Sequence, residues 1–300
     1  MRMLVTGANG LLGSAVAAEL TRRGHTCIAA GRAPQPRCAD AAAYVQTDLC
    51  DAQAVQACIA DTRPDAVIHC AAWTDVDGAE LPENRAQVFA VNAGGTKNVA
   101  AACRDAGCRL LYLTTDYVFD GTGTAPYPAD CNRFAPLNVY GESKLAGERA
   151  VMETLERYFI VRTSWVYGTG GKNFVRTMLR LSRTHDTLRV VSDQVGTPTY
   201  APDLARLLVD MAESDRCGRY NAVNSGGYVS WYDFACAIFR AAGIPMTVLP
   251  VTTEEYGQSL AARPHNSRLD TGKLTEAGFA PLPDWQDALA RCLAAEHAAD

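Results

Sequence analysis

A tyrosine and a lysine stand four residues apart in the segment Tyr140-Gly-Glu-Ser-Lys144. If this segment is helical, both side chains project from one face, about 6 Å apart along the helix axis. A nearby ammonium group favours the ionised form of a phenol, whose pKa is near 10 in water. Such a tyrosine can donate its proton to a carbonyl oxygen while a hydride reaches the carbon. The spacing alone is common, and a surface pair on a helix is the alternative interpretation.

A hydroxyl group at the end of the preceding predicted strand would complete this constellation. The run Leu111-Tyr-Leu-Thr-Thr115 places Thr115 at a carboxyl end, and in a parallel sheet these ends face the ligand crevice. There, Thr115 can hydrogen-bond to a substrate oxygen and orient it beside Tyr140. Threonine is also a good strand former, so Thr115 alone would indicate only a strand.

The N-terminal segment Gly7-Ala-Asn-Gly10-Leu-Leu-Gly13 follows a predicted strand at 3–5 and opens a predicted helix at Leu11. In this context Gly7 permits a tight turn, Gly10 lets the backbone approach a pyrophosphate, and Gly13 lets helix and strand pack closely. The free N–H groups and the dipole of the helix N-terminus attract phosphate groups. The segment therefore predicts a dinucleotide site, with a plain strand-to-helix turn as the alternative.

The end of the second predicted strand selects between NAD and NADP. A carboxylate at this place binds the adenosine ribose diol of NAD and repels the 2′-phosphate of NADP. Here the strand ends as Ala30-Gly31-Arg32, without a carboxylate, and Arg32 can pair with a 2′-phosphate. NADPH is therefore the predicted cofactor, with NADH as a possible second donor, and a solvent-facing Arg32 is the alternative.

The elements that must position these residues alternate between strands and helices in the first half of the chain. Such a series predicts a parallel sheet with helices on both faces. The predicted fold class is α/β, a Rossmann-type doubly wound parallel sheet with a smaller mixed α/β substrate-binding region in the C-terminal half. The predicted strands are 3–5, 26–30, 44–45, 66–68, 109–113 and 159–162, and the predicted helices are 11–23, 51–60, 83–106 and 138–157.

The rhythm of the chain changes after residue 164. Residues 1–164 are predicted to form an NADP(H)-binding Rossmann domain that carries the catalytic residues. Residues 165–300 are predicted to form mainly a nucleotide-sugar-binding region, with some segments returning to the Rossmann sheet. No flexible linker separates the halves, so they should pack tightly. The remaining predictions are a long loop at 120–136, helices at 173–183, 202–213 and 230–242, and strands at 189–191 and 247–249.

Composition excludes several classes of partner. The formal net charge is −5 and no block of Lys and Arg stands out, so a nucleic acid partner is not expected. The 11 cysteines lack the spacing of metal ligands, which indicates free thiols in a reducing cytosol and no metal site. No signal peptide or membrane span is expected, so the expected location is the cytoplasm. A monomer or a homodimer is the expected state.

Longer runs match a known family. The GxxGxxG spacing resembles that of the extended branch of the short-chain dehydrogenase/reductase superfamily. Together with the runs below, the chain resembles the dTDP-4-dehydrorhamnose reductase family from one end to the other. These runs are Thr115-Asp-Tyr-Val-Phe-Asp-Gly121, Pro136-Leu-Asn-Val-Tyr-Gly-Glu-Ser-Lys-Leu-Ala-Gly-Glu148, Arg162-Thr-Ser-Trp-Val-Tyr-Gly168, Asp193-Gln-Val-Gly-Thr-Pro-Thr199, Arg263-Pro-His-Asn-Ser-Arg-Leu269 and Leu282-Pro-Asp-Trp285.

The resemblance implies a reaction in which NADPH reduces the C4 carbonyl of dTDP-4-dehydro-L-rhamnose. The product would be dTDP-L-rhamnose, made in the last step of dTDP-rhamnose biosynthesis for bacterial surface polysaccharide. By position, the implied catalytic residues are Thr115, Tyr140 and Lys144. The implied cofactor-binding residues are Gly7, Gly10, Leu11, Leu12, Gly13, Arg32, Asp48, Leu49, Cys70, Ala71, Ala72, Leu113, Tyr140 and Lys144.

The resemblance also implies the substrate-binding residues Thr115, Asp116, Trp165 and Arg263. Arg263 would meet the substrate pyrophosphate, and a structural ion pair is the alternative. A tryptophan such as Trp165 is more often a core residue, although it can supply an apolar platform and an N–H donor to a deoxy-sugar.

Two further positions carry alternatives of their own. Asp48 resembles an adenine-contacting residue, but it can instead cap the helix that begins near Asp51. Asn92 matches a structural asparagine of the superfamily, and helix packing or a bond to the main chain is its alternative.

The chain also departs from the family pattern. Some members dimerise around magnesium, but Ala15 and Pro202 replace acidic residues, which puts a metal-bridged dimer in doubt. The loop between Thr115 and Tyr140 is one residue longer than expected, which can alter the substrate range.

Two other functions compete with the reductase. One is a different nucleotide-sugar keto-reductase or an epimerase, although Gly31-Arg32 argues against the tight NAD binding of an epimerase. The other is a non-catalytic NADP-binding regulatory subunit of methionine adenosyltransferase, against which the intact Thr115, Tyr140 and Lys144 argue.

Overall fold

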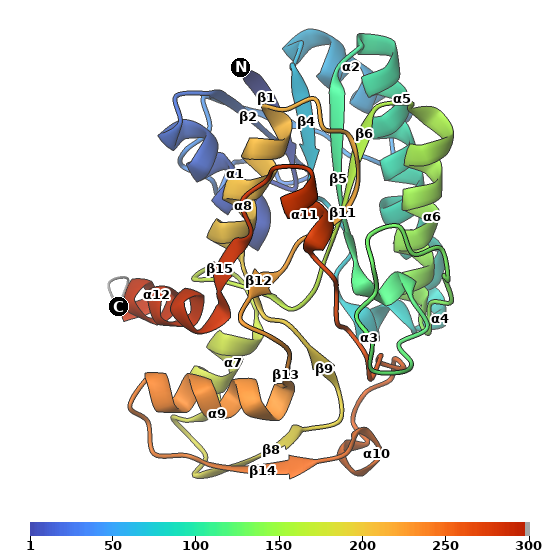
Figure 1. Cartoon of the computed structure of the whole chain (residues 1–300). Helices are drawn as coiled ribbons and strands as arrows, with labels where there is room; N and C mark the ends of the chain where they lie inside the picture. The colour runs from blue at the N-terminus through green and yellow to red at the C-terminus, as the bar shows by residue number, and fades with distance from the viewer. Residues whose placement is uncertain (298–300) are drawn as a thin grey trace.

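The apolar strands of the first half of the chain lie side by side in one seven-stranded parallel sheet (Figure 1). This is seen in a computed structural model that describes residues 1–297. The strand order is β11-β6-β5-β4-β1-β2-β3. The chain thus adds β2 and β3 on one side of β1 and then β4, β5, β6 and β11 on the other side. The strands are β1 (Arg2–Thr6), β2 (Thr26–Gly31), β3 (Ala43–Gln46), β4 (Ala66–His69), β5 (Arg109–Thr115), β6 (Tyr158–Thr163) and β11 (Gly218–Asn221).

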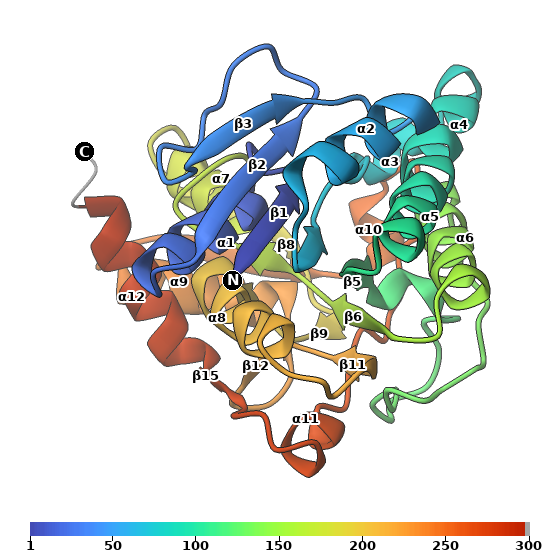
Figure 2. The same cartoon turned by 90° about the horizontal axis from the view of Figure 1, so that it is seen from above.

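Helices cover both faces of this sheet, as Figure 2 shows from above. One face packs against α1 (Leu11–Arg22) and α8 (Ala201–Ala212), and the other against α2 (Ala52–Thr62), α5 (Thr96–Ala106) and α6 (Val139–Thr154). Alternate side chains of each strand enter opposite cores, so a strand buried on both faces consists almost entirely of apolar residues. The predicted fold class, a doubly wound parallel α/β sheet, is confirmed.

The helix predicted over 83–106 is interrupted by a wider turn. It consists of α4 (Pro82–Phe89), a π-helix η1 (Ala90–Gly95) and then α5. Within η1, the amide of Asn92 accepts a hydrogen bond from the backbone N–H of Trp73 at 2.7 Å and donates one to the Ser143 hydroxyl at 2.9 Å. Asn92 therefore connects the segment after β4 to helix α6, as a structural residue would.

Most of the elements that follow residue 164 form a smaller body below the carboxyl edge of the sheet (Figure 1). Ser230, at the first position of the helix predicted over 230–242, is the N-cap of α9, and Asp233 completes a reciprocal capping box with it. The main elements are α7 (Phe174–Leu181), α9 (Trp231–Ala241), α12 (Trp285–His297) and the parallel pair β8 (Thr187–Val191) and β14 (Thr247–Val251). Short elements complete the chain: α3 (Val76–Ala79), η2 (Asp116–Val118), β7 (Val166–Tyr167), β9 (Val195–Gly196), β10 (Thr199–Tyr200), β12 (Asn224–Ser225), β13 (Val229–Ser230), α10 (Thr253–Tyr256), α11 (Gly272–Glu276) and β15 (Leu282–Asp284).

Two elements from the second half of the chain belong to the sheet body. Both α8 and β11 follow residue 164 in the chain, yet α8 covers the large sheet and β11 pairs with β6 at its edge. The side chain of Arg23 in the sheet body also binds Asp210 of α8 at 2.6 Å. We therefore propose that a division at residue 164 separates most of the two functions, while α8 and β11 return to the cofactor-binding body.

The predicted loop at 120–136 is attached to the sheet by a fully buried ion pair. Arg162 of β6 and Glu148 of α6 bind through two contacts of 2.6 and 3.0 Å, and both side chains are 0% exposed. The guanidinium of Arg162 also donates to the carbonyl oxygen of Ala129 at 2.9 Å and lies against the rings of Phe119 and Phe134. Because removal of one partner would leave a buried charge unpaired, this pair holds the loop in one place.

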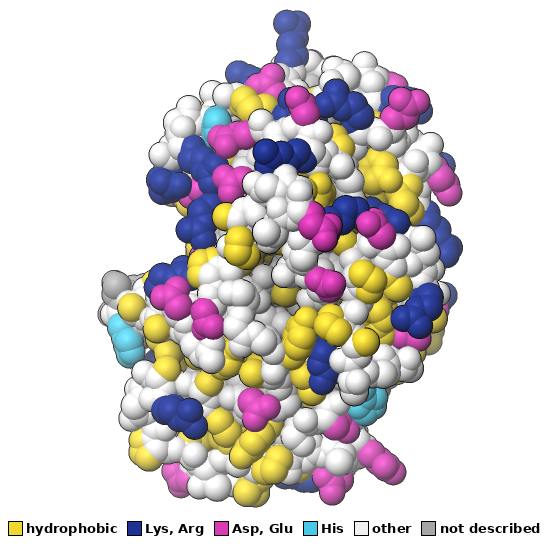
Figure 3. Space-filling view, viewed as in Figure 1, with side chains coloured by type: hydrophobic (Ala, Val, Ile, Leu, Met, Phe, Trp, Pro, Cys, Tyr) yellow, Lys and Arg dark blue, Asp and Glu magenta, His cyan; other side chains and the backbone are white. Residues whose placement is uncertain are grey.

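Charges are dispersed over the surface. On the face drawn in Figure 3, basic and acidic side chains alternate and none of them forms a large patch of one sign. Within residues 1–297, no helix combines the length and the apolar character that crossing a bilayer requires.

Helix α6 lies unusually close to β5 and η1. A side chain at Gly147 would collide with the Tyr112 hydroxyl and, at 2.7 Å, with the carbonyl oxygen of Asn92. A side chain at Gly141 would collide with the carbonyl oxygen of Tyr117. These two glycines therefore permit the approach that carries the predicted catalytic residues of α6 to the end of β5.

The Gly147→Ala variant should lower the free energy of unfolding by about 1–3 kcal/mol, because the added methyl overpacks a close contact. Urea denaturation measures this difference. The matched control is Gly94→Ala in η1, where an added Cβ meets only the carbonyl oxygen of Phe89 at 3.9 Å. Equal stabilities of the two variants would contradict the close-packing argument.

Candidate active site

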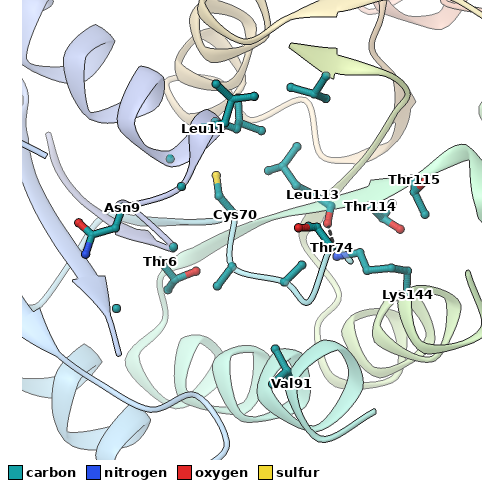
Figure 4. A pocket seen from close by; sticks show the side chains of 18 of the residues that line it. Thr6, Asn9, Leu11, Cys70, Thr74, Val91, Leu113, Thr114, Thr115 and Lys144 are labelled. Carbon is teal, nitrogen blue, oxygen red and sulfur yellow. Dashed lines mark hydrogen bonds between the residues drawn. The ribbon is translucent and has the colours of Figure 1, made fainter. Parts of the chain in front are cut away.

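The carboxyl ends of β1, β4, β5 and β6 open into a cavity of about 770 Å³ between the two bodies. A crevice at this edge, where the strand order reverses, is the usual ligand site of an open parallel sheet. With the exception of Arg263, every site residue predicted from the sequence lines it, and Figure 4 shows part of this lining. These lining residues are Gly7, Gly10, Leu11, Leu12, Gly13, Arg32, Asp48, Leu49, Cys70, Ala71, Ala72, Leu113, Thr115, Asp116, Tyr140, Lys144 and Trp165.

The glycine segment forms the turn from β1 into α1. Gly7 has a positive φ of 68°, and a Cβ there would lie 2.7 Å from Cα of Ala71. A side chain at Gly13 would overlap the carbonyl oxygen of Gly7, so the helix packs directly on the turn. Gly10 precedes α1 without any side-chain cap, which leaves the first N–H groups of the helix free to bind an anion.

Two arginines flank the adenosine end of the cavity. Arg32 follows β2 as predicted, and Arg37 also lines the cavity. The side chain of Asn9 holds this segment, because it accepts a hydrogen bond from the N–H of Arg37 at 2.7 Å and donates one to the carbonyl oxygen of Gln35 at 3.3 Å. The two cationic side chains and the lack of a carboxylate at the end of β2 suit a phosphate group here.

Asp48 does not cap the following helix. The cap of α2 is Asp51, which accepts hydrogen bonds from the N–H groups of Gln53 and Ala54. Asp48 instead accepts from the N–H of Cys50 at 3.0 Å and lines the cavity beside Leu49. The capping alternative for Asp48 is therefore wrong, and its place suits contact with a ligand.

Lys144 is almost wholly buried, with 2% of its surface exposed. Its ammonium group donates to the carbonyl oxygen of Leu113 at 2.7 Å, as Figure 4 shows, and lies 4.3 Å from the ring centre of Tyr112. Burial lowers the pKa of Lys144 to about 7, although the negative charge of Glu148 acts to raise it. Lys144 therefore sits near the balance between its charged and neutral forms at neutral pH.

Tyr140 stands one helical turn before Lys144 on α6, as the spacing predicted. Burial raises the pKa of its phenol, the nearby charge of Asp116 raises it further, and the hydroxyl of Thr115 opposes this. The ring of Tyr117 meets Tyr140 edge-on, with ring centres 5.8 Å apart. Tyr140 is thus held in its protonated form, which is the form that a proton donor needs.

Asp116 adds a buried carboxylate beside these groups. It is 3% exposed and accepts a hydrogen bond from the Thr115 hydroxyl at 3.0 Å through Oδ1. Within the described residues, its Oδ2 has no hydrogen-bond partner. Burial raises the pKa of Asp116 to about 6. An unpartnered buried acceptor at the cavity wall suits a ligand hydroxyl, which agrees with the sugar contact that the resemblance implied.

Arg263 lies outside the cavity lining. Its contacts are those of the ion-pair alternative, and its contact with the substrate pyrophosphate stays a prediction. Its guanidinium binds Asp77 at 2.6 Å and Ser259 at 2.9 Å, and donates to the Tyr117 hydroxyl at 3.4 Å. Asp77 belongs to α3, a short helix that the sequence pattern did not reveal. Since the acidic partner lies 186 residues away in the chain, only the fold brings it to Arg263.

Arg37, Lys172 and Trp231 are among the residues of the cavity wall that sequence reasoning missed. Lys172 ends a glycine-rich loop that lies on the start of α1, where a Cβ at Gly168 would be 3.0 Å from Leu11. The Gly-Gly-Lys run at 170–172 was a usable signal for this contact. Trp231 gave no such signal, because a tryptophan at the start of a helix is normally a core residue.

A carboxyl-edge crevice with a glycine turn, a Tyr140–Lys144 pair on its wall and a neighbouring Thr115 defines an extended short-chain dehydrogenase/reductase. The sequence model of the family described as "RmlD substrate binding domain" matches residues 1–298. The chain belongs to this family, which includes the dTDP-4-dehydrorhamnose reductases.

Individual relatives agree with this assignment. The dTDP-4-dehydrorhamnose reductase of Streptomyces griseus is 43% identical over 96% of this chain and 91% of its own length. The dTDP-4-keto-6-deoxy-D-glucose reductase of Streptomyces niveus is 39% identical over 96% of this chain and 95% of its own. The crystal structure of dTDP-4-dehydrorhamnose reductase from Bacillus anthracis, in complex with NADP, has a TM-score of 0.87 at 38% identity, and the match covers 98% of this chain and 99% of that one.

The Asp116→Asn variant should be clearly more stable than the wild type at pH 8 but hardly so at pH 4. The fold raises the pKa of Asp116 from 3.8 to about 6, so it favours the neutral acid, and this contribution is lost as the pH rises from 3.8 through 6. The neutral amide avoids that loss, which is worth up to about 3 kcal/mol. Thermal unfolding at both pH values measures the difference.

The matched control for this variant is Asp105→Asn, whose carboxylate is exposed and pairs with Arg104 at the surface. It should change the unfolding temperature little at either pH. A gain for Asp116→Asn that is the same at pH 4 and pH 8 would contradict the assignment of the buried charge.

Proposed function

We propose that the chain reduces the C4 carbonyl of dTDP-4-dehydro-L-rhamnose to give dTDP-L-rhamnose, with NADPH as the hydride donor. The observation that carries this proposal is the single cavity in which the phosphate-binding turn at Gly10 and the groups Thr115, Tyr140 and Lys144 converge. The substrate assignment is supported by the family and by the relatives that bear this name.

The residues of the cavity fit NADPH. The uncapped N-terminus of α1 would hold the pyrophosphate, because Gly7 and Gly13 keep side chains away from it. Arg32 would pair with the 2′-phosphate, with Arg37 nearby. Asp48, Leu49, Cys70, Ala71, Ala72 and Leu113 would line the rest of the dinucleotide site. When bound, NADPH supplies the hydride, and the relative from Bacillus anthracis was solved with NADP.

The residues of this chain then provide orientation and the proton. Thr115 hydrogen-bonds to the carbonyl oxygen of the sugar and holds it beside Tyr140. The phenol of Tyr140 donates its proton to that oxygen as the carbon is reduced. Lys144 is within one helical turn, and it stabilises the phenolate that this step leaves behind. Because burial raises the pKa of Tyr140, its phenol is protonated before the step and can donate that proton.

Asp116 and Trp165 would bind the sugar ring. The free Oδ2 of Asp116 accepts a hydrogen bond from a sugar hydroxyl, while the indole of Trp165 provides an apolar surface for the deoxy-sugar. The Streptomyces niveus relative is named for a different 4-keto sugar, so another keto-reductase specificity is the second candidate.

The two remaining alternatives receive less support. An epimerase needs tightly held NAD, whereas Arg32 and Arg37 favour a 2′-phosphate. A regulatory subunit needs no proton donor, whereas the half-buried Tyr140 and the buried Lys144 lie together at the cavity wall. We further propose a monomer or a homodimer in the cytoplasm that acts on a dTDP-sugar without nucleic acid or membrane. The free state of all 11 cysteines suits a reducing compartment.

Replacement of Tyr140 by Phe should lower kcat by about a hundredfold or more, because the proton donor is removed. The assay follows the loss of NADPH absorbance with dTDP-4-dehydro-L-rhamnose made enzymatically in the same tube. The variant should fold normally and bind NADPH as the wild type does. Near-native turnover in this variant would refute the role of Tyr140, and no turnover of any keto-sugar by the folded wild type would favour the regulatory alternative.

The Arg32→Ala variant should raise KM for NADPH about tenfold or more and leave KM for NADH nearly unchanged. A charge-assisted hydrogen bond to a phosphate contributes about 1.5–3 kcal/mol, and NADH lacks that phosphate. Initial rates with each cofactor measure the change, and Arg104→Ala outside the cavity is the control. A parallel loss with both cofactors would show that Arg32 acts on a group that they share.

A further inference from the structure

Two tryptophans from different bodies of the molecule stack face to face at the cavity wall. Trp165 follows β6 of the large sheet, and Trp231 is the first residue of α9 in the smaller body. Their ring centres are 3.5 Å apart and the rings are inclined by 13°. Both line the cavity and both are half-buried. Since this separation is van der Waals contact, no ligand fits between the two rings.

The backbone of Trp165 is in a conformation that it would not adopt alone. Its φ is +50°, in the left-handed region that bulky residues rarely occupy. Its carbonyl oxygen accepts a hydrogen bond from the N–H of Thr199 at 3.1 Å, next to the short pair β7 and β10. Strain of this kind persists only where the surroundings over-determine it, and it concentrates at functional sites.

The indole of Trp165 is also confined by β9. A Cβ at Gly196 would lie 3.0 and 3.1 Å from two ring atoms of Trp165 and 2.9 Å from Cβ of Ser267. Glycine at 196 therefore leaves room for the ring, and β9 and Trp231 together determine its orientation.

Trp231 is itself held rigidly. The reciprocal cap formed by Ser230 and Asp233 begins α9 at this residue. The ring of Phe174 on α7 packs against Trp231, with ring centres 4.5 Å apart. The smaller body thus presents Trp231 as a fixed surface, and Trp165 rests on it.

We propose that Trp231 is a positioning residue for the sugar nucleotide: it holds Trp165 in the orientation in which that indole meets the sugar. This inference rests on the proposed function, because it assumes a sugar at Trp165. It assigns to the smaller body a contribution to sugar binding that acts through Trp165. The phosphate-binding turn at Gly10 and the 2′-phosphate site at Arg32 contain neither tryptophan, so cofactor binding should not depend on the stack.

The experiment compares Trp231→Ala and Trp231→Phe with the wild type. The Ala variant should raise KM for the keto-sugar about tenfold with a smaller change in kcat, since an aromatic pair contributes roughly 0.5–1.5 kcal/mol beyond its buried area. Its Kd for NADPH, from cofactor fluorescence, should stay within about twofold of the wild type. The Phe variant should recover most of the sugar affinity, because a second ring again supports Trp165.

Two further measurements separate positioning from a general loss of structure. The circular dichroism couplet of the two stacked indoles should disappear in Trp231→Ala and persist in the control Tyr232→Ala, the next residue on α9, which does not line the cavity. Gly196→Ala should raise KM for the sugar in the same way, because it displaces the Trp165 ring while Trp231 remains.

Calorimetry of dTDP-L-rhamnose in the presence of NADP gives the sugar affinity without turnover. If the wild type binds and turns over the sugar and Trp231→Ala does so with equal KM and Kd, the positioning role is overturned and the reductase assignment stands. If the folded wild type neither binds nor reduces any dTDP-sugar, the proposed function fails, and the role of Trp231 fails with it.

Discussion

The close approach of helix α6 to β5 and η1 is the constraint on which the site depends. Gly141 and Gly147 allow it, since a side chain at either position would meet the backbone or side chain of the opposing element. The approach removes Lys144 from water, and the carbonyl oxygen of Leu113 replaces part of the lost hydration. The same contact places Tyr140 beside the carboxyl end of β5. The arrangement of the proposed catalytic residues is therefore a consequence of helix-to-sheet packing.

Burial shifts the pKa values of Lys144 and Tyr140, the two proposed catalytic groups, in opposite directions. Burial disfavours the charged form of each group. It therefore lowers the pKa of Lys144, whose ammonium is charged, to about 7, and it raises the pKa of Tyr140, whose phenolate is charged. A protonated phenol next to an easily charged lysine can release a proton and then be stabilised as the phenolate. Asp116 belongs to the same dry environment, and its unpartnered oxygen is available to a sugar hydroxyl.

Much of the fold was predictable because the local signals were strong. The GxxGxxG turn, the apolar strands and the Ser230 cap each depend on interactions between residues that are near in sequence. Features that depend on distant partners were not predictable in this way. The helix predicted at 83–106 is present but contains the π-helix η1, within which Asn92 binds Trp73 and Ser143. Arg263 forms an ion pair with Asp77, which no pattern in the sequence connects to it.

By itself, the sequence determined the class of the sheet, the phosphate-binding turn, the Tyr140–Lys144 pair and the family. These features follow from short-range periodicity and from residue types whose chemistry does not depend on the rest of the chain. Only the tertiary structure decided which side chains share the cavity, how far burial shifts the pKa of each, and that Trp231 supports Trp165 from the other body. Desolvation and stacking depend on neighbours that are distant in sequence, so the residues alone do not specify them.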